Sequence, residues 1–158
     1  MNQEKYKTCQ LREDPDKVLM VDDNPTNLQV LQATLEGRGY RLLAARDGAS
    51  ALAVATKAMP DLILLDIMMP RMSGFEVCRK LKSDPATRDV PVIMVTALNE
   101  LGDIERAVDS GTDDFLSKPV NRLELVTRVR NLLWVRHLKS QLDRTLAYLT
   151  ELEKRPEP

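Results

Sequence analysis

Four short apolar runs in this chain each end on a polar residue that can handle phosphate or a metal ion. The runs and their end residues are Lys17–Val21 with Asp22 and Asp23, Leu62–Leu65 with Asp66, residues 92–95 with Thr96, and residues 115–117 with Lys118. Ligands of open α/β sheets bind outside the carboxyl ends of the strands. Parallel neighbouring strands would therefore gather three carboxylates, a hydroxyl and an ammonium group at one edge. Such a cluster is typical of a divalent metal ion beside an aspartate that accepts a phosphoryl group.

The chemistry of these side chains narrows the ligand. Asp22 and Asp23 alone are explained equally well as helix-capping residues, but Asp66 at the end of a second strand weakens that interpretation. Three carboxylates brought close together repel one another unless a cation or protonation relieves the charge. Mg²⁺ suits the site because it prefers hard oxygen ligands. Lys118 would supply a positive charge for phosphoryl oxygens and Thr96 a neutral donor, so transfer would leave an acyl phosphate on Asp66.

The composition excludes several other classes of function. The 158 residues are 43% hydrophobic and 30% charged, which is ordinary for a soluble globular protein of about one domain. A net charge of -1 gives no basic surface for nucleic acid or an anionic membrane, and no apolar run is long enough to span a bilayer. Cys9 and Cys78 form no metal-binding spacing, and His137 is the single histidine, which excludes a His-rich zinc site or a Ser-His-Asp triad. We therefore expect a reduced, cytoplasmic protein.

Strand and helix signals alternate from Lys17 onwards and predict the fold. Strands are expected at Lys17–Val21, Arg41–Ala45, Leu62–Leu65, 92–95 and Asp114–Ser117. Helices are expected from Pro25 to before Gly37, from Gly48 to Ala58, around 75–83, around 100–110, and after Pro119. Five strand–helix pairs with short connections indicate a doubly wound parallel sheet with helices on both faces, because right-handed crossovers place each helix over the sheet. The fold class is therefore α/β.

The last predicted helix is too long for such a domain, since neither glycine nor proline occurs between Asn121 and Pro156. Apolar residues recur in it at a three-four spacing, with Thr145 in the one polar core position: Val135, Leu138, Leu142, Leu149 and Leu152. This pattern predicts a coiled coil of about three heptads. Arg128 and Asn131 would occupy core positions if it continued backwards, so we place the boundary near Arg136. We expect a loosely held tail (1–16), a domain (17–136) and a helical extension (137–158) that forms a homodimer rather than folding back as a cap.

Other charged residues receive plainer interpretations. His137, at the start of the extension, is expected to be an exposed polar residue. Asp113 and Asp114 precede the last strand and are expected in a solvated turn. The basic run that contains Arg128 and Arg136 is interrupted by acidic neighbours, so we interpret it as a solvated helix face.

The site motifs together resemble a known family. The matching segments are Val21-Asp22-Asp23-Asn24, Leu65-Asp66-Ile67-Met68-Met69-Pro70, Ser73-Gly74, Val95-Thr96-Ala97 and Ser117-Lys118-Pro119-Val120. In this order and at these spacings they resemble the receiver domain of two-component response regulators. The likeness covers roughly residues 17–136. Each motif alone is weak evidence, whereas the ordered set is highly specific.

The resemblance implies a phosphoacceptor with a metal site. Asp66 would take a phosphoryl group from a phosphohistidine on a sensor histidine kinase or a phosphotransfer protein. Asp23 and Asp66 would bind Mg²⁺ directly, the backbone carbonyl of Met68 would be a further ligand, and Asp22 would act mostly through water.

The resemblance also implies a switch and a strand order. Thr96 and Lys118 would contact the phosphoryl oxygens, and Phe115 would turn inward together with Thr96 on activation. Pro119 would follow a cis peptide bond that helps aim Lys118. The family's sheet has the flavodoxin-like order 2-1-3-4-5.

Three alternatives differ in what the acidic site does. A Mg²⁺-dependent phosphohydrolase of the haloacid-dehalogenase kind needs an acid/base two residues after the nucleophile, where this chain has Met68. A phosphorylation-independent dimerisation module would usually lack one of the acids. A receiver cut from a longer regulator with an enzymatic output domain is compatible with the sequence. We favour a phosphorylation-driven switch that catalyses only its own phosphorylation and dephosphorylation.

Overall fold

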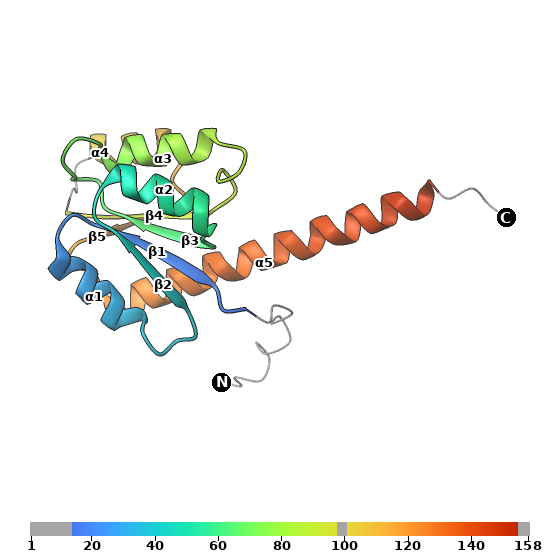
Figure 1. Ribbon diagram of the computed structural model, residues 1–158, viewed down its shortest axis with the longest axis horizontal. Helices are drawn as coiled ribbons and strands as arrows, with labels where there is room; N and C mark the ends of the chain where they lie inside the picture. The colour runs from blue at the N-terminus through green and yellow to red at the C-terminus, as the bar shows by residue number, and fades with distance from the viewer. Residues whose placement is uncertain (1–13, 98–100, 155–158) are drawn as a thin grey trace.

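Five strands alternate with five helices in the computed structural model, which describes residues 14–97 and 101–154 (Figure 1). The strands are β1 (Lys17–Val21), β2 (Arg41–Ala45), β3 (Leu62–Leu65), β4 (Val92–Thr96) and β5 (Asp114–Ser117). The helices are α1 (Pro25–Leu35), α2 (Gly48–Ala58), α3 (Gly74–Ser83), α4 (Leu101–Asp109) and α5 (Arg122–Glu153). The predicted α/β class is confirmed. Glu100, with which we expected the fourth helix to begin, lies outside the described residues.

The sheet has the strand order β2-β1-β3-β4-β5, and each neighbouring pair is parallel. The predicted order 2-1-3-4-5 is therefore confirmed. The register places Val21 opposite Leu65, and the backbone N–H of Asp66 donates to the carbonyl of Val21 at 2.9 Å. The carboxyl ends of β1 and β3 are thus level, which places the residues that follow them side by side.

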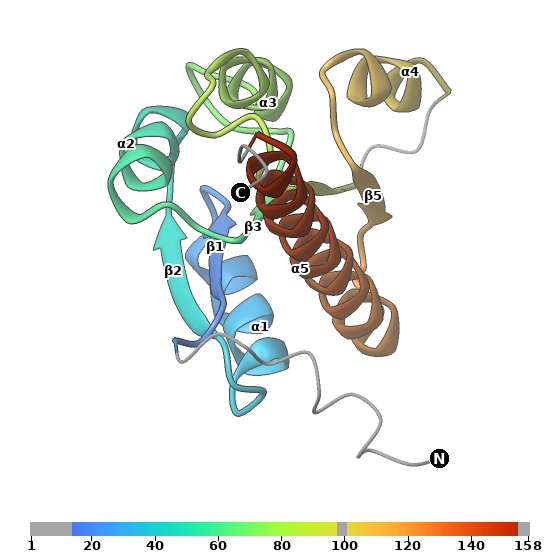
Figure 2. The same cartoon turned by 90° about the vertical axis from the view of Figure 1, so that its right-hand side faces the viewer.

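The helices cover the two faces of the sheet and divide the core in two. On one face, Leu19 and Val21 pack with Phe75 of α3 and with residues of α2 and α4. On the other face, Val18 and Met20 pack with residues of α1 and α5. Figure 2 shows this layering, with α2, α3 and α4 on one side and α1 and α5 on the other. Alternate residues of one strand serve opposite faces, so strands buried on both sides are apolar throughout.

Side-chain caps start the helices that lead away from the site. Asn24 accepts from the backbone N–H of Thr26, with Pro25 as the first helical residue of α1. Ser73 accepts from the N–H of Glu76 at the start of α3. These side chains satisfy N–H groups that the helix itself leaves unpaired. The third helix begins at Gly74, one residue before our prediction.

Helix α5 is 32 residues long; it crosses beneath the sheet and then projects well beyond the domain (Figure 1). Its buried residues are Leu125, Val129 and Leu133. The helix passes through the predicted boundary near Arg136 without a break. Among the residues that the structure describes, no helix has the length and apolarity that a membrane span requires.

Some plainer interpretations of charged residues are wrong. The side chain of His137 is only 22% exposed, and its Nε2 lies 3.0 Å from a carboxylate oxygen of Asp16. Asp113 does lie exposed in the bend before β5, as expected for a solvated turn, but it also accepts from the backbone N–H of Val92 at 2.8 Å and from Lys82 at 2.7 Å, so it ties α3 to β4. Arg128 forms an ion pair with Asp114 at 2.8 Å. These residues hold elements together because each has an opposite charge or a backbone group that only the fold brings near.

Candidate functional site

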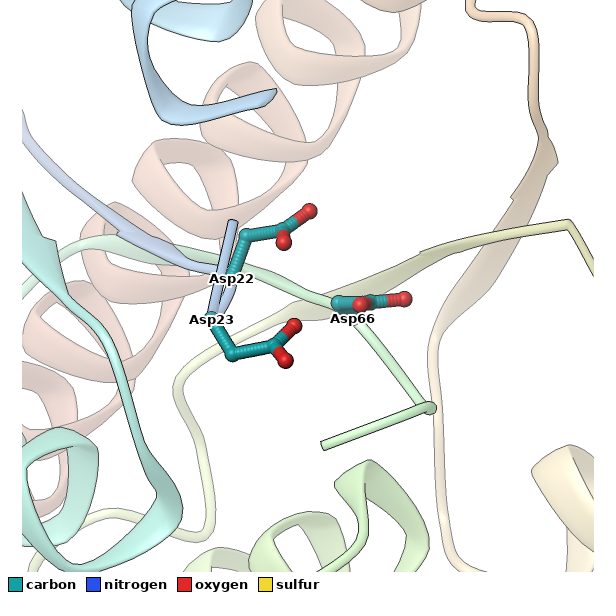
Figure 3. Close-up of side chains that lie close together, drawn as sticks. All are labelled: Asp22, Asp23 and Asp66. Carbon is teal, nitrogen blue, oxygen red and sulfur yellow. The ribbon is translucent and has the colours of Figure 1, made fainter. Parts of the chain in front are cut away.

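The three predicted acidic residues meet at the carboxyl edge of the sheet. Asp22 and Asp23 follow β1, Asp66 follows β3, and their carboxylates point into one space (Figure 3). One oxygen from each lies within 4.8 Å of the others. This separation allows a single cation to reach all three carboxylates. Hard oxygen donors in this number fit Mg²⁺, which is commonly held by one or two carboxylates with water completing the shell.

Asp22 is fully engaged by neighbouring donors. Its Oδ1 accepts from the backbone N–H of Asn24 at 2.9 Å and from the Asn27 amide at 3.3 Å. Its Oδ2 accepts from Nζ of Lys118 at 2.9 Å. Asp23 is half-buried, so it is the more accessible of the adjacent pair. Asp22 therefore orients Lys118 and offers less to a metal ion than Asp23 does.

Asp66 is nearly buried, with 6% of its surface exposed. Burial raises the pKa of its carboxyl to about 6, because water no longer stabilises the charged form. The charge of Lys118 lowers this pKa and the charge of Asp22 raises it. Nζ of Lys118 lies 3.7 Å from Oδ1 of Asp66. A divalent cation or a phosphoryl group with its metal would therefore relieve an electrostatic cost that is already built into the pocket.

Lys118 and Thr96 come from the next two strands of the sheet. Thr96 is buried at the end of β4, and its backbone carbonyl accepts from the N–H of Lys118 at 2.8 Å. The peptide bond between Lys118 and Pro119 is cis, as the resemblance implies. Phe115 is half-buried in β5 and packs against the core shared with α3. The structure thus brings Thr96 and the ammonium group of Lys118 to the same edge as the acids.

The loop after Asp66 is held close to α3 by a glycine whose role the sequence alone did not reveal. Gly74 donates its N–H to the carbonyl of Ile67 at 2.9 Å. A Cβ on Gly74 would lie 2.3 Å from the backbone oxygen of Asp66, so no other residue fits without moving that backbone. Met68 is 63% exposed and its thioether is a poor ligand for a hard cation, so its backbone carbonyl is the group that could serve the site.

A cavity of about 450 Å³ opens beside the acidic cluster, next to Asp23 and Met68. Its far wall includes Arg106 of α4, whose guanidinium lies 4.3 Å from the ring centre of Phe75. This cation–π contact ties α4 to α3. Neither residue stands out in the sequence, because the contact depends on how the two helices pack.

Comparison with known proteins identifies the family. Residues 18–130 match the response regulator receiver domain. This chain belongs to that family. It is 49% identical over 116 residues to the response regulator PleD of Caulobacter vibrioides, which covers 73% of this chain and 26% of that protein. It is 43% identical over 117 residues to the DNA-binding regulator RpaA of Synechocystis, covering 74% of this chain and 48% of RpaA. The receiver domain thus spans about a quarter to a half of these relatives.

A solved structure extends the likeness to the site. The receiver domain of a sensor histidine kinase from Pseudomonas aeruginosa PAO1 has a magnesium ion coordinated in its active site cleft. It is 34% identical to this chain, with a TM-score of 0.70 and coverage of 75% of this chain and 98% of that domain. The expected membership of a two-component system is confirmed. The individual roles of the site residues remain predictions.

Proposed function

We propose that this receiver domain accepts a phosphoryl group on Asp66 from a phosphohistidine of a sensor histidine kinase or phosphotransfer protein. The observation that carries the proposal is the meeting of Asp22, Asp23, Asp66 and Lys118 at one sheet edge. In the transfer, a carboxylate oxygen of Asp66 attacks phosphorus, the phosphorus–nitrogen bond breaks, and the imidazole keeps the electron pair. The chain would thus catalyse its own phosphorylation and dephosphorylation.

Each side chain has a role that follows from its position. Asp66 has a pKa of about 6, so it is mostly ionised and able to attack at pH 7 and above. Mg²⁺ held by Asp23, Asp66 and the Met68 carbonyl would neutralise charge on the phosphoryl oxygens. Asp22 holds Lys118 within 3.7 Å of Asp66, where the ammonium group can bind a phosphoryl oxygen. Thr96 would donate its hydroxyl to another oxygen, and Phe115 would follow it inward.

The proposal is tested with acetyl phosphate, Mg²⁺ and intact-protein mass spectrometry. We expect one base-labile phosphoryl group on the full chain and none on Asp66→Asn. Asp109→Asn, an exposed carboxylate on α4, is the matched control and should be phosphorylated like the unmodified chain. Phosphorylation of Asp66→Asn at the unmodified rate would refute the assignment.

We also propose that the extension of α5 joins two copies of this chain. Eight large side chains beyond Leu133 are each between 39% and 61% exposed. They are Trp134, Val135, Leu138, Leu142, Leu146, Tyr148, Leu149 and Leu152. An apolar surface of this extent on a projecting helix favours a protein partner.

The direction of that apolar face supports an external partner. Leu133 packs on the sheet, and Leu142 follows nine positions later. Nine positions are about two and a half helical turns, so Leu142 lies on the opposite side of the helix from Leu133. The same nine positions separate buried Val129 from exposed Leu138. The apolar face of the extension therefore points away from its own domain, and a straight helix cannot fold it back.

Self-association is measured by light scattering or sedimentation on the full chain. Leu149→Glu should lower the solution mass to that of a monomer, because it places a charge in the pairing surface. Ala147→Glu adds the same charge on the opposite side of the helix and should leave the dimer intact. A monomeric unmodified chain, or a dimer that Leu149→Glu does not weaken, would exclude this arrangement.

The net charge of -1 also favours protein partners over nucleic acid.

A further inference from the structure

The two strands that carry the acidic pocket also carry acids at their opposite ends. Asp16 directly precedes β1, which ends before Asp22, and Asp61 directly precedes β3, which ends before Asp66. Asp61 is only 4% exposed and accepts from the backbone N–H of Lys17 at 2.9 Å. The amino ends of β1 and β3 are therefore joined to each other, as their carboxyl ends are.

Helix α5 is held at this amino edge by two consecutive residues. Nε of Arg136 lies 3.7 Å from Oδ1 of Asp61, and its Nη1 donates to the backbone carbonyl of Asp89 at 2.8 Å. His137 Nε2 lies 3.0 Å from the Asp16 carboxylate, and both side chains are about four-fifths buried. These contacts come from three separate segments and hold the helix where it leaves the sheet.

Beyond these residues the helix separates from the domain. A groove of about 810 Å³ opens between α5 and the segment that contains Arg88 and Asp89. The next ion pair along the helix joins Lys139 to Asp89 at 3.7 Å, and both of its side chains are well exposed. Solvated pairs of this kind restrain a helix weakly. Within the described part of α5, Arg136 and His137 are thus the last residues that hold the helix with largely buried side chains.

We propose that Arg136 and His137, held by Asp16, Asp61 and the Asp89 carbonyl, form an amino-edge clamp. The clamp fixes the direction in which α5 leaves the domain. Because its acids sit on the amino ends of β1 and β3, it also connects the direction of α5 to the strands that carry the acidic pocket. The clamp lies within one chain and does not depend on phosphorylation or on dimer formation.

The direction of α5 can be measured by double electron–electron resonance, which gives the distance between a spin label on α2 and a spin label near the end of α5. Lys57→Cys and Glu151→Cys provide exposed attachment sites, Cys9→Ser removes one competing thiol, and Cys78 is buried. Labelled chains are diluted in excess unlabelled chain so that distances within one molecule dominate. We expect one narrow distance distribution for the unmodified clamp.

The test compares a variant that lacks the clamp with a matched control. Arg136→Gln combined with His137→Gln should broaden the distribution at least twofold while circular dichroism shows a folded domain. Arg144→Gln removes a guanidinium that donates to Ser140 on the same helix and should leave the distribution narrow. A distribution as narrow without the clamp as with it would show that Arg136 and His137 do not set the direction and would overturn the proposal.

A second measurement tests the connection to the pocket, and it rests on the proposed function of Asp66. Mg²⁺ with beryllium fluoride, a phosphoryl mimic, should shift the distance in the chain with an intact clamp and shift it less in the double variant. Fluorine NMR reports separately whether the mimic is bound. A bound mimic with no shift would refute the connection, whereas no binding would refute the phosphoacceptor role and leave the clamp standing on the first measurement.

Discussion

Replacing Gly74 with alanine should displace Asp66, so that phosphorylation slows greatly while the chain stays folded. The new Cβ would lie 2.3 Å from the Asp66 carbonyl oxygen and 2.7 Å from Cα of Ile67. Ordinary contacts between such atoms are about 3.5 Å, so the two backbones must part by on the order of 1 Å. Both opposing atoms belong to the backbone, which cannot rotate away as a side chain can.

The magnitude follows from that displacement. Overpacking of this kind costs about 1–3 kcal/mol of stability, and Gly74 already begins α3, so little helix propensity is recovered. A misplacement of about 1 Å at a reacting group can lower a rate by about 100-fold. We therefore expect Gly74→Ala to remain folded, with a modestly lower free energy of unfolding and a much slower reaction with acetyl phosphate.

Two other glycines serve as controls for this prediction. A Cβ on Gly48 would meet the Met72 and Val77 side chains at 2.8–2.9 Å, so Gly48→Ala should cost similar stability with little effect on the reaction rate. Nothing lies within 4 Å of a Cβ on Gly102, so Gly102→Ala should be neutral or stabilising. Urea unfolding and the rate of phosphorylation are measured on all three variants. Gly74→Ala with the rate of the unmodified chain would refute the reasoning.

The remaining predictions concern charge in the pocket, and their measurements are made with a chelator present to remove divalent cations, unless Mg²⁺ is added. The pKa of Asp66 in the folded chain is raised from 3.8 to about 6, so Asp66 favours the folded state most below pH 4, and this contribution is lost as the pH rises through 6. The difference in unfolding free energy between the unmodified chain and Asp66→Asn should therefore change by about 2–3 kcal/mol over that range. A flat difference would contradict the assigned burial. Added Mg²⁺ should stabilise the chain at pH 8, by about 1.4 kcal/mol at tenfold its dissociation constant, and should do so less in Asp23→Asn. Lys118→Ala should raise the pKa of Asp66 above 6 and move the pH profile of phosphorylation to higher pH; an unmoved profile would place Lys118 outside the electrostatics of Asp66.

The central strands could be predicted from sequence because burial on both faces leaves a distinct pattern. Residues 18–21 and Leu62–Leu65 are buried throughout, so each reads as an uninterrupted apolar run. Strand order came from the resemblance, since parallel strands of this kind carry no signal of which neighbour they choose. The helix starts were predictable at Asn24 and Asp47, because a cap acts on backbone groups two or three residues away.

The sequence predicted which residues form the site better than it predicted how their side chains contact one another. Strand ends in an α/β sheet meet at one edge, which brought Asp22, Asp66 and Lys118 together. The sequence did not indicate that Lys118 would lie closer to Asp22 than to Asp66, because that preference depends on side-chain geometry. His137 shows the limit most clearly: its partner, Asp16, is 121 positions away, and no local pattern reports a contact of that range.

Helix α5 crosses the whole domain before it projects, and this makes its free segment a lever arm. From Arg136 to Glu153 the helix extends about 26 Å at about 1.5 Å per residue. A tilt of the helix by about 10° at Arg136 would move its end by about 4–5 Å, roughly half the usual distance of 8–10 Å between packed helix axes. An angular change too small to alter the body of the molecule would therefore be large enough at the far end to slide one helix out of register with another.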